Sequence, residues 1–337
     1  DNRLTIDYTN GDPLPADGLF FNSGRQRRRD ELVIVGGSNF TDINHSFTNR
    51  TDGTIDLDGK TISYTGLEVI LDQAGTLNRA FQFPALRDVV VLQDAERANN
   101  GLLKLSNGSR SVPVTFASPA ESLTVRAGAG NDYVEVRALD PGFAPSATIT
   151  VEGGADRDKL LATKVARSIR LDGGMDADTL RGGSGGDVLL GSEGDDNLAG
   201  RAGDDLLDGG IGNDRLYGED GNDTLLGDAG SDTLRGGLDD DRINGGIGND
   251  YLYGQNGNDT IRGGGDDDRL DGGSDDDNLL GEGGRDTILG RAGTDRVGGG
   301  SGDGPDVGDR VLPFNPLAQI DEAFSINDDW EVIDSVM

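Results

Sequence analysis

The sequence predicts an all-β protein: a parallel β-roll or β-solenoid, preceded by wider β-helical coils and an N-terminal β-rich domain. A nine-residue unit, G-x-x-[GD]-x-D-x-U-x with U aliphatic, repeats fourteen times between Gly173 and Gly298 without an insertion. The preceding sequence consists of short apolar runs between Gly, Asp and Asn, and no long window has helical periodicity. Strict register over fourteen units is typical of stacked repeats.

The composition points to bound cations. The 337 residues carry a formal charge of -32, only 5% of them are aromatic, and cysteine is absent. A thick conventional core is therefore not expected, and disulfides and thiolate metal sites are excluded. Carboxylates at this density repel one another unless cations neutralise them, so we expect metal and no nucleic acid. No long apolar run of the kind that spans a bilayer is present, so no membrane span is predicted.

Residues 1–117 are predicted to form the N-terminal β-rich domain. Runs such as LTIDY, ELVIVGG and DVVVL are typical of short strands. Asp58-Gly59, between TIDL and KTISY, predicts a hairpin turn, because both residues tolerate positive φ. A sandwich-like domain and an irregular β-helix both fit these runs.

Residues 118–172 predict wide coils of a parallel β-helix. The segments SLTVRAGAGNDYVEV and ATITVEGGADRDKLLA each place a Gly/Asp turn between two strands. The spacing from the turn aspartate Asp132 to Asp158, and from Asp158 to Asp178, is in both cases longer than two of the nine-residue units. Coils of this size fit a solenoid that narrows into the nine-residue repeat, so Asp132 and Asp158 join the candidate metal ligands.

Each nine-residue unit, from Gly173 to Gly298, is predicted to form a six-residue turn followed by a three-residue strand. Positions one and four, which are Gly or Asp, suit positive φ. If successive units form strands on opposite sides of a flattened coil, two units make one turn, and seven turns span roughly 30 to 35 Å. The aliphatic residues at position eight then form a thin core, while the turns stack in two outer columns.

Position six of every unit is aspartate, and this column is the predicted metal site. It comprises Asp178, Asp187, Asp196, Asp205, Asp214, Asp223, Asp232, Asp241, Asp250, Asp259, Asp268, Asp277, Asp286 and Asp295. Calcium takes six to eight oxygen ligands in flexible geometry, which suits mixed carboxylates and turn carbonyls better than the strict octahedron of magnesium. Ions between neighbouring turns on both sides of the roll would number about twelve, and their charge would offset much of the negative excess.

The units resemble the glycine-rich nonapeptides of RTX (repeats-in-toxin, hemolysin-type) calcium-binding proteins, whose motif is G-G-x-G-x-D-x-U-x. GGIGNDRLY at 209–217 and GGIGNDYLY at 245–253 match this motif at every place. The resemblance covers residues 173–298 and implies a parallel β-roll, with calcium held between adjacent turns by the position-six aspartates and turn carbonyls. It also implies secretion of an unfolded chain by a type I-like route and folding on extracellular calcium.

Position two departs from the RTX motif in seven units, where we expect a perturbed backbone. The glycine is replaced by Ser192, Arg201, Glu219, Asp228, Gln255, Glu282 and Arg291.

The pattern ends after Gly298. Residues 299–337 contain LPFNPLAQIDEAF and the only tryptophan. We expect this tail to cap the last coil with one short helix, because an exposed strand edge recruits other chains. The alternative is a C-terminal export signal, suggested by the ending EVIDSVM.

A basic cluster stands out in the N-terminal domain of this acidic chain. It consists of Arg25, Arg27, Arg28 and Arg29. The simplest interpretation is a solvated loop. The alternative is a docking site for an acidic partner, either another copy of this chain or an anionic surface polysaccharide.

No catalytic site is predicted. His45 is the only histidine, expected as a surface or strand residue, and HExxH, G-x-S-x-G and cysteine nucleophiles are all absent. We therefore expect a secreted calcium-binding structural protein, acting in a surface layer, in adhesion or in a self-assembling fibre, rather than an enzyme. The alternative is a calcium-dependent secretion and folding module of a larger secreted enzyme or toxin.

Overall fold

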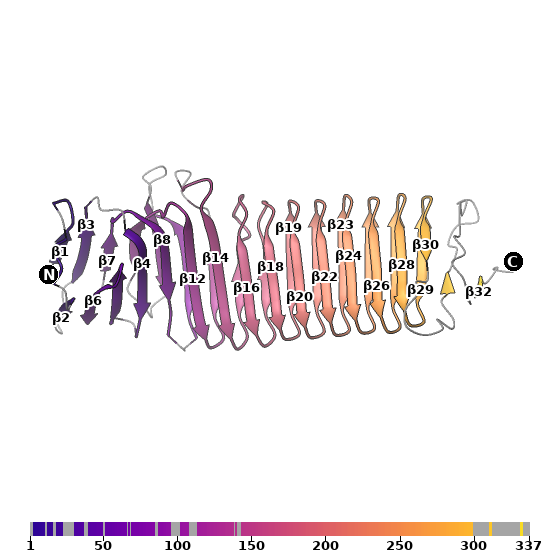
Figure 1. Ribbon diagram of the computed structural model, residues 1–337, viewed down its shortest axis with the longest axis horizontal. Helices are drawn as coiled ribbons and strands as arrows, with labels where there is room; N and C mark the ends of the chain where they lie inside the picture. Colours follow the sequence, from indigo (N-terminus) through magenta and orange to yellow (C-terminus); the bar gives the residue numbers. More distant parts are fainter. Residues whose placement is uncertain are drawn as a thin grey trace. The chain divides into compact units, whose positions relative to one another are not determined.

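A computed structural model gives the fold. It describes residues 3–10, 12–15, 18–22, 30–36, 40–49, 51–65, 67, 69–84, 87–95, 102–107, 113–137, 139, 143–298, 310–311 and 331–332. Within these ranges the chain forms strands and no helix, so the predicted all-β class is confirmed (Figure 1). The same ranges accordingly offer no helix that is long and apolar enough for a membrane span. The chain divides into two compact units, Asp1–Gly173 and Gly174–Met337.

The first unit has the strand pairing of an irregular β-helix. Its strands are β1 (Arg3–Asp7), β2 (Leu19–Asn22), β3 (Glu31–Val35), β4 (Phe40–Phe47), β5 (Gly53–Leu57), β6 (Lys60–Thr65), β7 (Val69–Asp72), β8 (Thr76–Gln82), β9 (Val89–Asp94), β10 (Leu102–Asn107), β11 (Val114–Ala117), β12 (Ser122–Ala129), β13 (Tyr133–Val136), β14 (Thr148–Ala155) and β15 (Lys159–Leu161). In one sheet β1, β3, β7 and β11 pair in parallel, as do β9, β13 and β15. In the other sheet β4, β8, β12 and β14 pair in parallel.

Two antiparallel insertions interrupt this winding. The strands β4, β5 and β6 form one meander, and β9, β10 and β11 form the other. The turn between β5 and β6 is the predicted hairpin: Leu57 pairs with Lys60, and Asp58 and Gly59 have φ values of 50° and 87°. The hairpin prediction is therefore confirmed.

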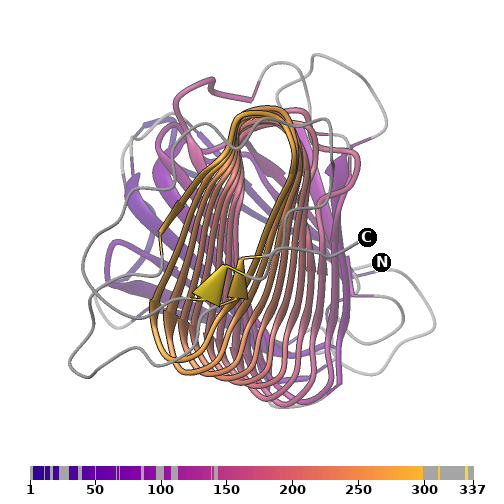
Figure 2. The same cartoon turned by 90° about the vertical axis from the view of Figure 1, so that its right-hand side faces the viewer.

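The second unit is a regular parallel roll. Its strands are β17 (Thr179–Arg181), β18 (Val188–Glu193), β19 (Asn197–Ala202), β20 (Leu206–Ile211), β21 (Arg215–Asp220), β22 (Thr224–Ala229), β23 (Thr233–Leu238), β24 (Arg242–Ile247), β25 (Tyr251–Asn256), β26 (Thr260–Gly265), β27 (Arg269–Ser274), β28 (Asn278–Gly283), β29 (Thr287–Ala292), β30 (Arg296–Gly298), β31 (Arg310–Val311) and β32 (Glu331–Val332); β16 (Arg170–Met175) crosses the boundary. From β17 to β30, odd-numbered strands form one sheet and even-numbered strands the other (Figure 2). Paired residues lie two nine-residue units apart, as Leu198 and Leu216 show, which confirms the predicted coil length.

The predicted division of the nine-residue unit is wrong. Most roll strands have six residues rather than three, because positions seven to nine of one unit continue into positions one to three of the next, as in β20. Only positions four to six remain as the turn. The glycine-rich positions look like turn sequence, yet their backbones still pair across the sheet, for example Ser192 with Gly210 and Glu193 with Ile211.

A thin aliphatic core fills the roll. The position-eight residues from Leu180 to Ile288 are at most 2% exposed, and the last one, Val297, is half-buried. One inward side chain per unit buries little area alone, so each coil depends on its neighbours for a core. Of residues 299–337 only β31 and β32 are described, so the predicted cap, its helix and the alternative export signal lie outside the described residues.

Candidate metal centre

The position-six aspartates end the turns and point into the roll. From Asp178 to Asp286 they are all at most 3% exposed, while the last one, Asp295, is half-buried. Burying so many carboxylates is unfavourable unless each is paired, hydrogen-bonded or bound to a metal.

One carboxylate oxygen of each aspartate joins adjacent coils. Oδ1 of Asp196 accepts a hydrogen bond of 2.7 Å from the backbone N–H of Asp178, one coil earlier. Each later aspartate repeats this contact, down to Asp295, whose Oδ1 accepts from the N–H of Asp277 at 3.1 Å. The ladder satisfies a turn amide in each coil and leaves the second oxygen for another partner.

The second oxygen is the unusual atom. Within the described residues, Oδ2 is buried without a hydrogen bond in Asp196, Asp205, Asp214, Asp223, Asp232, Asp241, Asp250, Asp259, Asp268 and Asp277. Leaving a buried polar atom unsatisfied costs about 1–3 kcal/mol, and more for a charged group. A recurring unsatisfied oxygen at the same place in successive turns indicates a ligand that supplies the missing charge.

The regular spacing of glycine at position one explains where Oδ2 lies. A Cβ added at Gly191 would lie 2.5 Å from the carbonyl oxygen of Gly209 and still closer to Oδ2 of Asp196. Other position-one glycines, such as Gly245, meet the same two kinds of oxygen. Carboxylate and carbonyl oxygens thus converge where a side chain is missing.

This geometry corrects one prediction and confirms another. Position one does not adopt positive φ, which occurs instead at positions two and four. Glycine is required at position one because a Cβ would collide with neighbouring oxygens. At position four, φ is 144° at Gly212 and 72° at Asp239, as predicted. The seven residues that replace glycine at position two keep the left-handed conformation, with φ between 66° and 88°. The backbone is therefore not perturbed there, although such φ values are unfavourable for residues with a side chain.

The electrostatics of the column also favour a cation. Burial raises the pKa of Asp205, Asp241 and Asp268 to about 8, although the hydrogen bond to Oδ1 lowers it and neighbouring carboxylates raise it further. The pKa of Asp214 and Asp232 is raised to about 7 for the same reasons. Near neutral pH the metal-free fold thus disfavours these charges, which a bound cation would stabilise.

The donor set fits calcium. Among the described residues no three acidic or histidine side chains converge on one point. A cation between two turns would therefore take its remaining oxygens from the backbone, and calcium accepts such mixtures of carboxylates and carbonyls at coordination numbers of six to eight.

Comparison with known protein families supports this assignment. The sequence matches the family model of the RTX calcium-binding nonapeptide repeat in overlapping segments from residue 172 to residue 304. Residues 172–304 are RTX calcium-binding repeats. No curated protein matches the chain significantly. The predicted family resemblance is confirmed for this segment, and with it calcium binding as the property of the repeats.

One turn pair outside the matched RTX segment has the same geometry. Oδ1 of Asp158 accepts a hydrogen bond of 2.8 Å from the N–H of Asp132, and a Cβ at Gly153 would approach Oδ2 of Asp158. The pKa values of Asp132 and Asp158 are raised to about 7, chiefly by burial. The structure thus places both aspartates in an arrangement like that of the RTX roll.

Sequence reasoning missed Asp88, which extends this pattern. The N–H of Asp88 donates to Oδ1 of Asp132 at 2.5 Å, and Asp88 is 2% exposed. The sequence offers one weak signal, which is that an aliphatic residue, Val90, stands two places after Asp88 as in the repeat. The preceding turn lacks the glycines of the repeat, so this signal does not stand out. The spacing of 44 residues between Asp88 and Asp132 also hides their relation.

A second side-chain ladder, at position five, was also missed. Oδ1 of Asp204 accepts from the N–H of Asn222 at 3.0 Å, and Oδ1 of Asn222 accepts from the N–H of Asp240 at 3.1 Å. This ladder continues through Asn258 and Asp276 on exposed turn positions. Its members alternate between Asp and Asn, so acceptor chemistry rather than charge defines the position.

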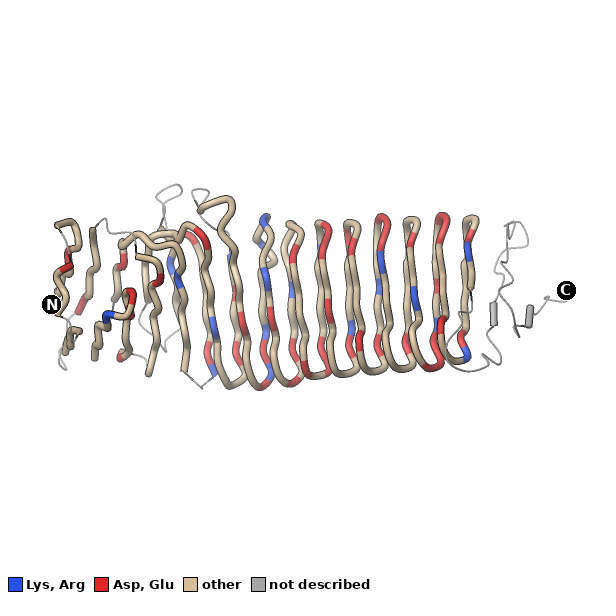
Figure 3. The backbone as a smooth tube through the Cα atoms, viewed as in Figure 1, with Lys and Arg blue, Asp and Glu red and all other residues tan. Residues whose placement is uncertain are grey.

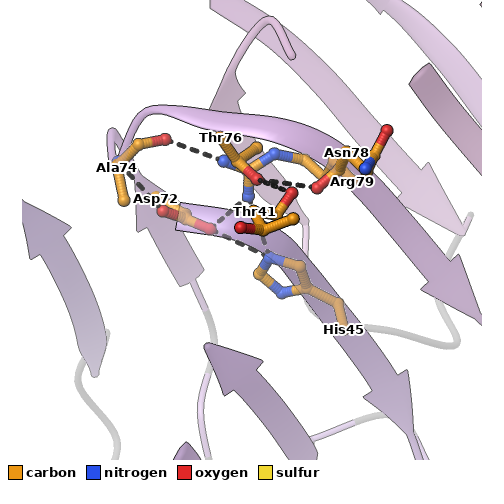
Figure 4. Close-up of polar contacts among 7 residues, drawn as sticks. All are labelled: Thr41, His45, Asp72, Ala74, Thr76, Asn78 and Arg79. Atoms are coloured by element: carbon orange, nitrogen blue, oxygen red, sulfur yellow. Dashed lines mark hydrogen bonds and ion pairs between the residues drawn. The ribbon is translucent and has the colours of Figure 1, made fainter. Parts of the chain in front are cut away.

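The single histidine belongs to a buried ion cluster in the first unit (Figure 4). His45 lies in β4, as one of the expected alternatives, and its Nε2 is 3.0 Å from Oδ2 of Asp72. Arg79 donates to the same oxygen and, at 2.9 Å, to the carbonyl of Ala74. Burial raises the pKa of Asp72, but Arg79 and His45 outweigh it and hold it at about 2. The three side chains are fully buried, so this cluster is structural.

The predicted basic cluster cannot be placed in this fold. Arg25, Arg27, Arg28 and Arg29 lie outside the described residues, so their alternative interpretations stay predictions.

Proposed function

We propose that the chain is a secreted calcium-binding structural protein whose RTX roll folds on extracellular calcium. Its role would be that of a surface-layer, adhesion or self-assembling fibre component. The observation that carries this proposal is the column of buried aspartates in which Oδ2 has no hydrogen bond and the pKa is raised. Such a column is unfavourable for a metal-free protein at neutral pH and suited to one loaded with cations.

The ions would lie between neighbouring turns. Oδ2 of the aspartates from Asp178 to Asp295 and the carbonyl oxygens near position one would hold them. Seven stacked turns on each side leave about twelve places, and two charges from each ion would offset most of the formal charge of -32. Asp132 and Asp158 would hold a further ion in the first unit.

Calcium would also determine where the roll folds. When a site exists only in the folded chain, the free energy of binding contributes directly to folding. Extracellular calcium modules bind at roughly 10⁻⁴ to 10⁻³ M, so the roll would form outside the cell and not in the cytoplasm. This coupling fits export of an unfolded chain.

The positions of the polar residues favour a structural role over a catalytic one. The aspartates of the roll lie in two repetitive columns, and the only histidine is enclosed with Asp72 and Arg79. The alternative, a folding and secretion module of a larger enzyme or toxin, is favoured by one observation: the RTX roll belongs to a compact unit separate from residues 1–173. A catalytic domain in a longer precursor would support this alternative.

Circular dichroism and equilibrium dialysis of the full chain test the proposal. We expect most of the β signal of the roll to disappear in chelator and return in millimolar calcium, with many ions bound per chain. An unchanged spectrum in chelator together with no bound calcium would refute it. Electron microscopy in calcium then separates the two roles, because a structural component should form ordered multimers and a folding module should stay monomeric.

A further inference from the structure

One face of the roll carries its aromatic side chains and much of its basic charge. In β17 to β29 of the odd-numbered sheet, six arginines stand against three carboxylates, Glu219, Asp220 and Asp271, and Asp271 is paired with Arg291. The centre of this face is a track made of Arg215, Tyr217, Arg235, Tyr251, Tyr253 and Arg269, on four successive strands. We call these six residues the Arg–Tyr track.

The track is pre-organised. The guanidinium carbon of Arg235 lies 5.7 Å from the ring centroid of Tyr217 and 5.4 Å from that of Tyr253, so it is held between two rings. The strand register places Arg215, Thr233, Tyr251 and Arg269 in one neighbouring row. An arginine fixed by aromatic rings loses little freedom on binding, so its donors are well placed for a carboxylate.

The cations of the track are available. Arg215, Arg235 and Arg269 are exposed, and none of the three forms an ion pair with any residue that the structure describes. The outward face of the even-numbered sheet differs, because Arg242, Arg262 and Arg296 are balanced there by Asp208, Asp228 and Glu282. The positive track is therefore a property of one face within a strongly acidic chain.

The same roll carries a surface that complements this track. Acidic residues gather at the turns of the roll (Figure 3). One column of turns presents Asp204, Asp240 and Asp276 at position five, all exposed, with no basic residue at its turn positions four to six. Hydrogen bonds to Oδ1 from the turn amides hold these side chains in a row. They are separate from the position-six column, so calcium would leave them free to pair. We call these three residues the acidic turn row.

We propose that the Arg–Tyr track of one copy binds the acidic turn row of a second copy. The proposal rests on the calcium-loaded roll described above and names its partner. Track and row belong to the same solenoid, with one axial repeat of about 4.8 Å per coil. Asp204, Asp240 and Asp276 recur every second coil, a spacing that Arg235 and Arg269 share, so two pairs can form at once. The track cannot face itself, because like charges would meet. A head-to-tail contact between unlike surfaces leads to an open-ended assembly wherever its rotation does not close a ring.

Variants that remove each surface separately test this docking. Sedimentation velocity is measured in millimolar calcium for the full chain, for R215S/R235S/R269S and for D204N/D240N/D276N. Asparagine keeps the Oδ1 acceptor of the row, as Asn222 and Asn258 already do. The wild type should form oligomers that grow with concentration. For each variant the dissociation constant of self-association should rise at least about tenfold. The matched control is R242S/R262S/R296S on the other sheet, which should assemble like the wild type.

Mixing the two variants gives the sharpest outcome. One retains the acidic row and the other the track, so together they should form a one-to-one complex that does not grow. A track variant that still assembles would overturn the docking while leaving the proposed function intact. A wild type that binds calcium but stays monomeric would overturn the docking and, with it, the structural role, in favour of the folding module. Binding of a polyuronate that only the track variant loses would also overturn it, in favour of an acidic glycan. A wild type that binds no calcium would refute the proposed function itself, and the docking with it.

Discussion

Replacement of Asp232 by asparagine separates the ladder function of a position-six residue from its metal function. Oδ1 of Asp232 accepts from the N–H of Asp214 at 2.7 Å, and an asparagine keeps this acceptor. Oδ2 is buried without a hydrogen bond, and asparagine removes its charge. The substitution should therefore leave the coil contact in place and abolish the anionic ligand.

Without calcium the variant should be more stable than the wild type. Burial raises the pKa of Asp232 from 3.8 to about 7, a difference that costs at most about 4 kcal/mol of folding free energy at pH 8. The new amide leaves buried N–H groups that cost about 1–3 kcal/mol. The net expectation in chelator is a gain of about 1–3 kcal/mol.

With calcium this gain should be cancelled. At a free concentration of about 10 mM, a site with a dissociation constant of roughly 10⁻⁴ to 10⁻³ M contributes about 1.4–2.7 kcal/mol, and this contribution would be lost at each affected site. Urea unfolding in calcium measures the second effect, and the β signal that remains in chelator, expected to be larger for the variant, measures the first. The matched control is Asp195→Asn, an exposed position-five residue whose Oδ1 also accepts a turn amide, at 2.8 Å. Equal destabilisation of Asp232→Asn in both conditions would refute a metal role.

The same contacts make three further predictions testable. Gly191→Ala should lower stability in calcium by about 1–3 kcal/mol, because its Cβ would displace Asp196 and the Gly209 carbonyl, whereas Gly265→Ala, with its nearest atom 3.9 Å away, should change it by less than about 0.5 kcal/mol. In chelator, raised aspartate pKa values mean that the fold binds more protons than the unfolded chain between about pH 4 and 8, so stability should fall as pH rises, by up to about 1.4 kcal/mol per pH unit for each aspartate. The β signal that the roll keeps in chelator should therefore be larger at about pH 5 than at about pH 8, and the opposite order would contradict the raised pKa values. In calcium, urea unfolding should show no such fall. Arg79→Met should destabilise the first unit by about 3–5 kcal/mol without changing the number of calcium ions bound by the roll, and simultaneous replacement of Asp72 by Leu should recover most of the loss; an unaffected melt of Arg79→Met would contradict the buried cluster.

The sequence predicted the parts of the roll that depend on side-chain chemistry repeated in register. The inward aliphatic column and the coil of two units needed only a strict period and the alternation of a strand. The position-six aspartates were found for the same reason. The predicted strand length was wrong because glycine has two structural roles that a sequence does not distinguish. Gly191 lies in an extended segment and provides space for Asp196, whereas Gly212 provides positive φ.

Long-range partners in the first unit were beyond sequence reasoning. His45, Asp72 and Arg79 are separated by 27 and 7 residues and come from different strands, so nothing local indicates that they meet. Asp88 and Asp132 are related only by the coil that brings them together across 44 residues. In the irregular β-helix coil length varies, so the register that reveals such pairs in the roll is lost.

The two side-chain ladders of the roll run in opposite directions. At position six a carboxylate serves the amide of the preceding coil, as Asp196 does for Asp178; at position five it serves the following coil, as Asp195 does for Asn213. Each coil from the one with Asp195 and Asp204 to the one with Asp267 and Asp276 therefore supplies an acceptor to both of its neighbours, so the roll can change length with its ladders intact only in whole coils. Excising two successive units would let both ladders close again, whereas excising a single unit would exchange the two turn columns and move every later strand to the opposite sheet.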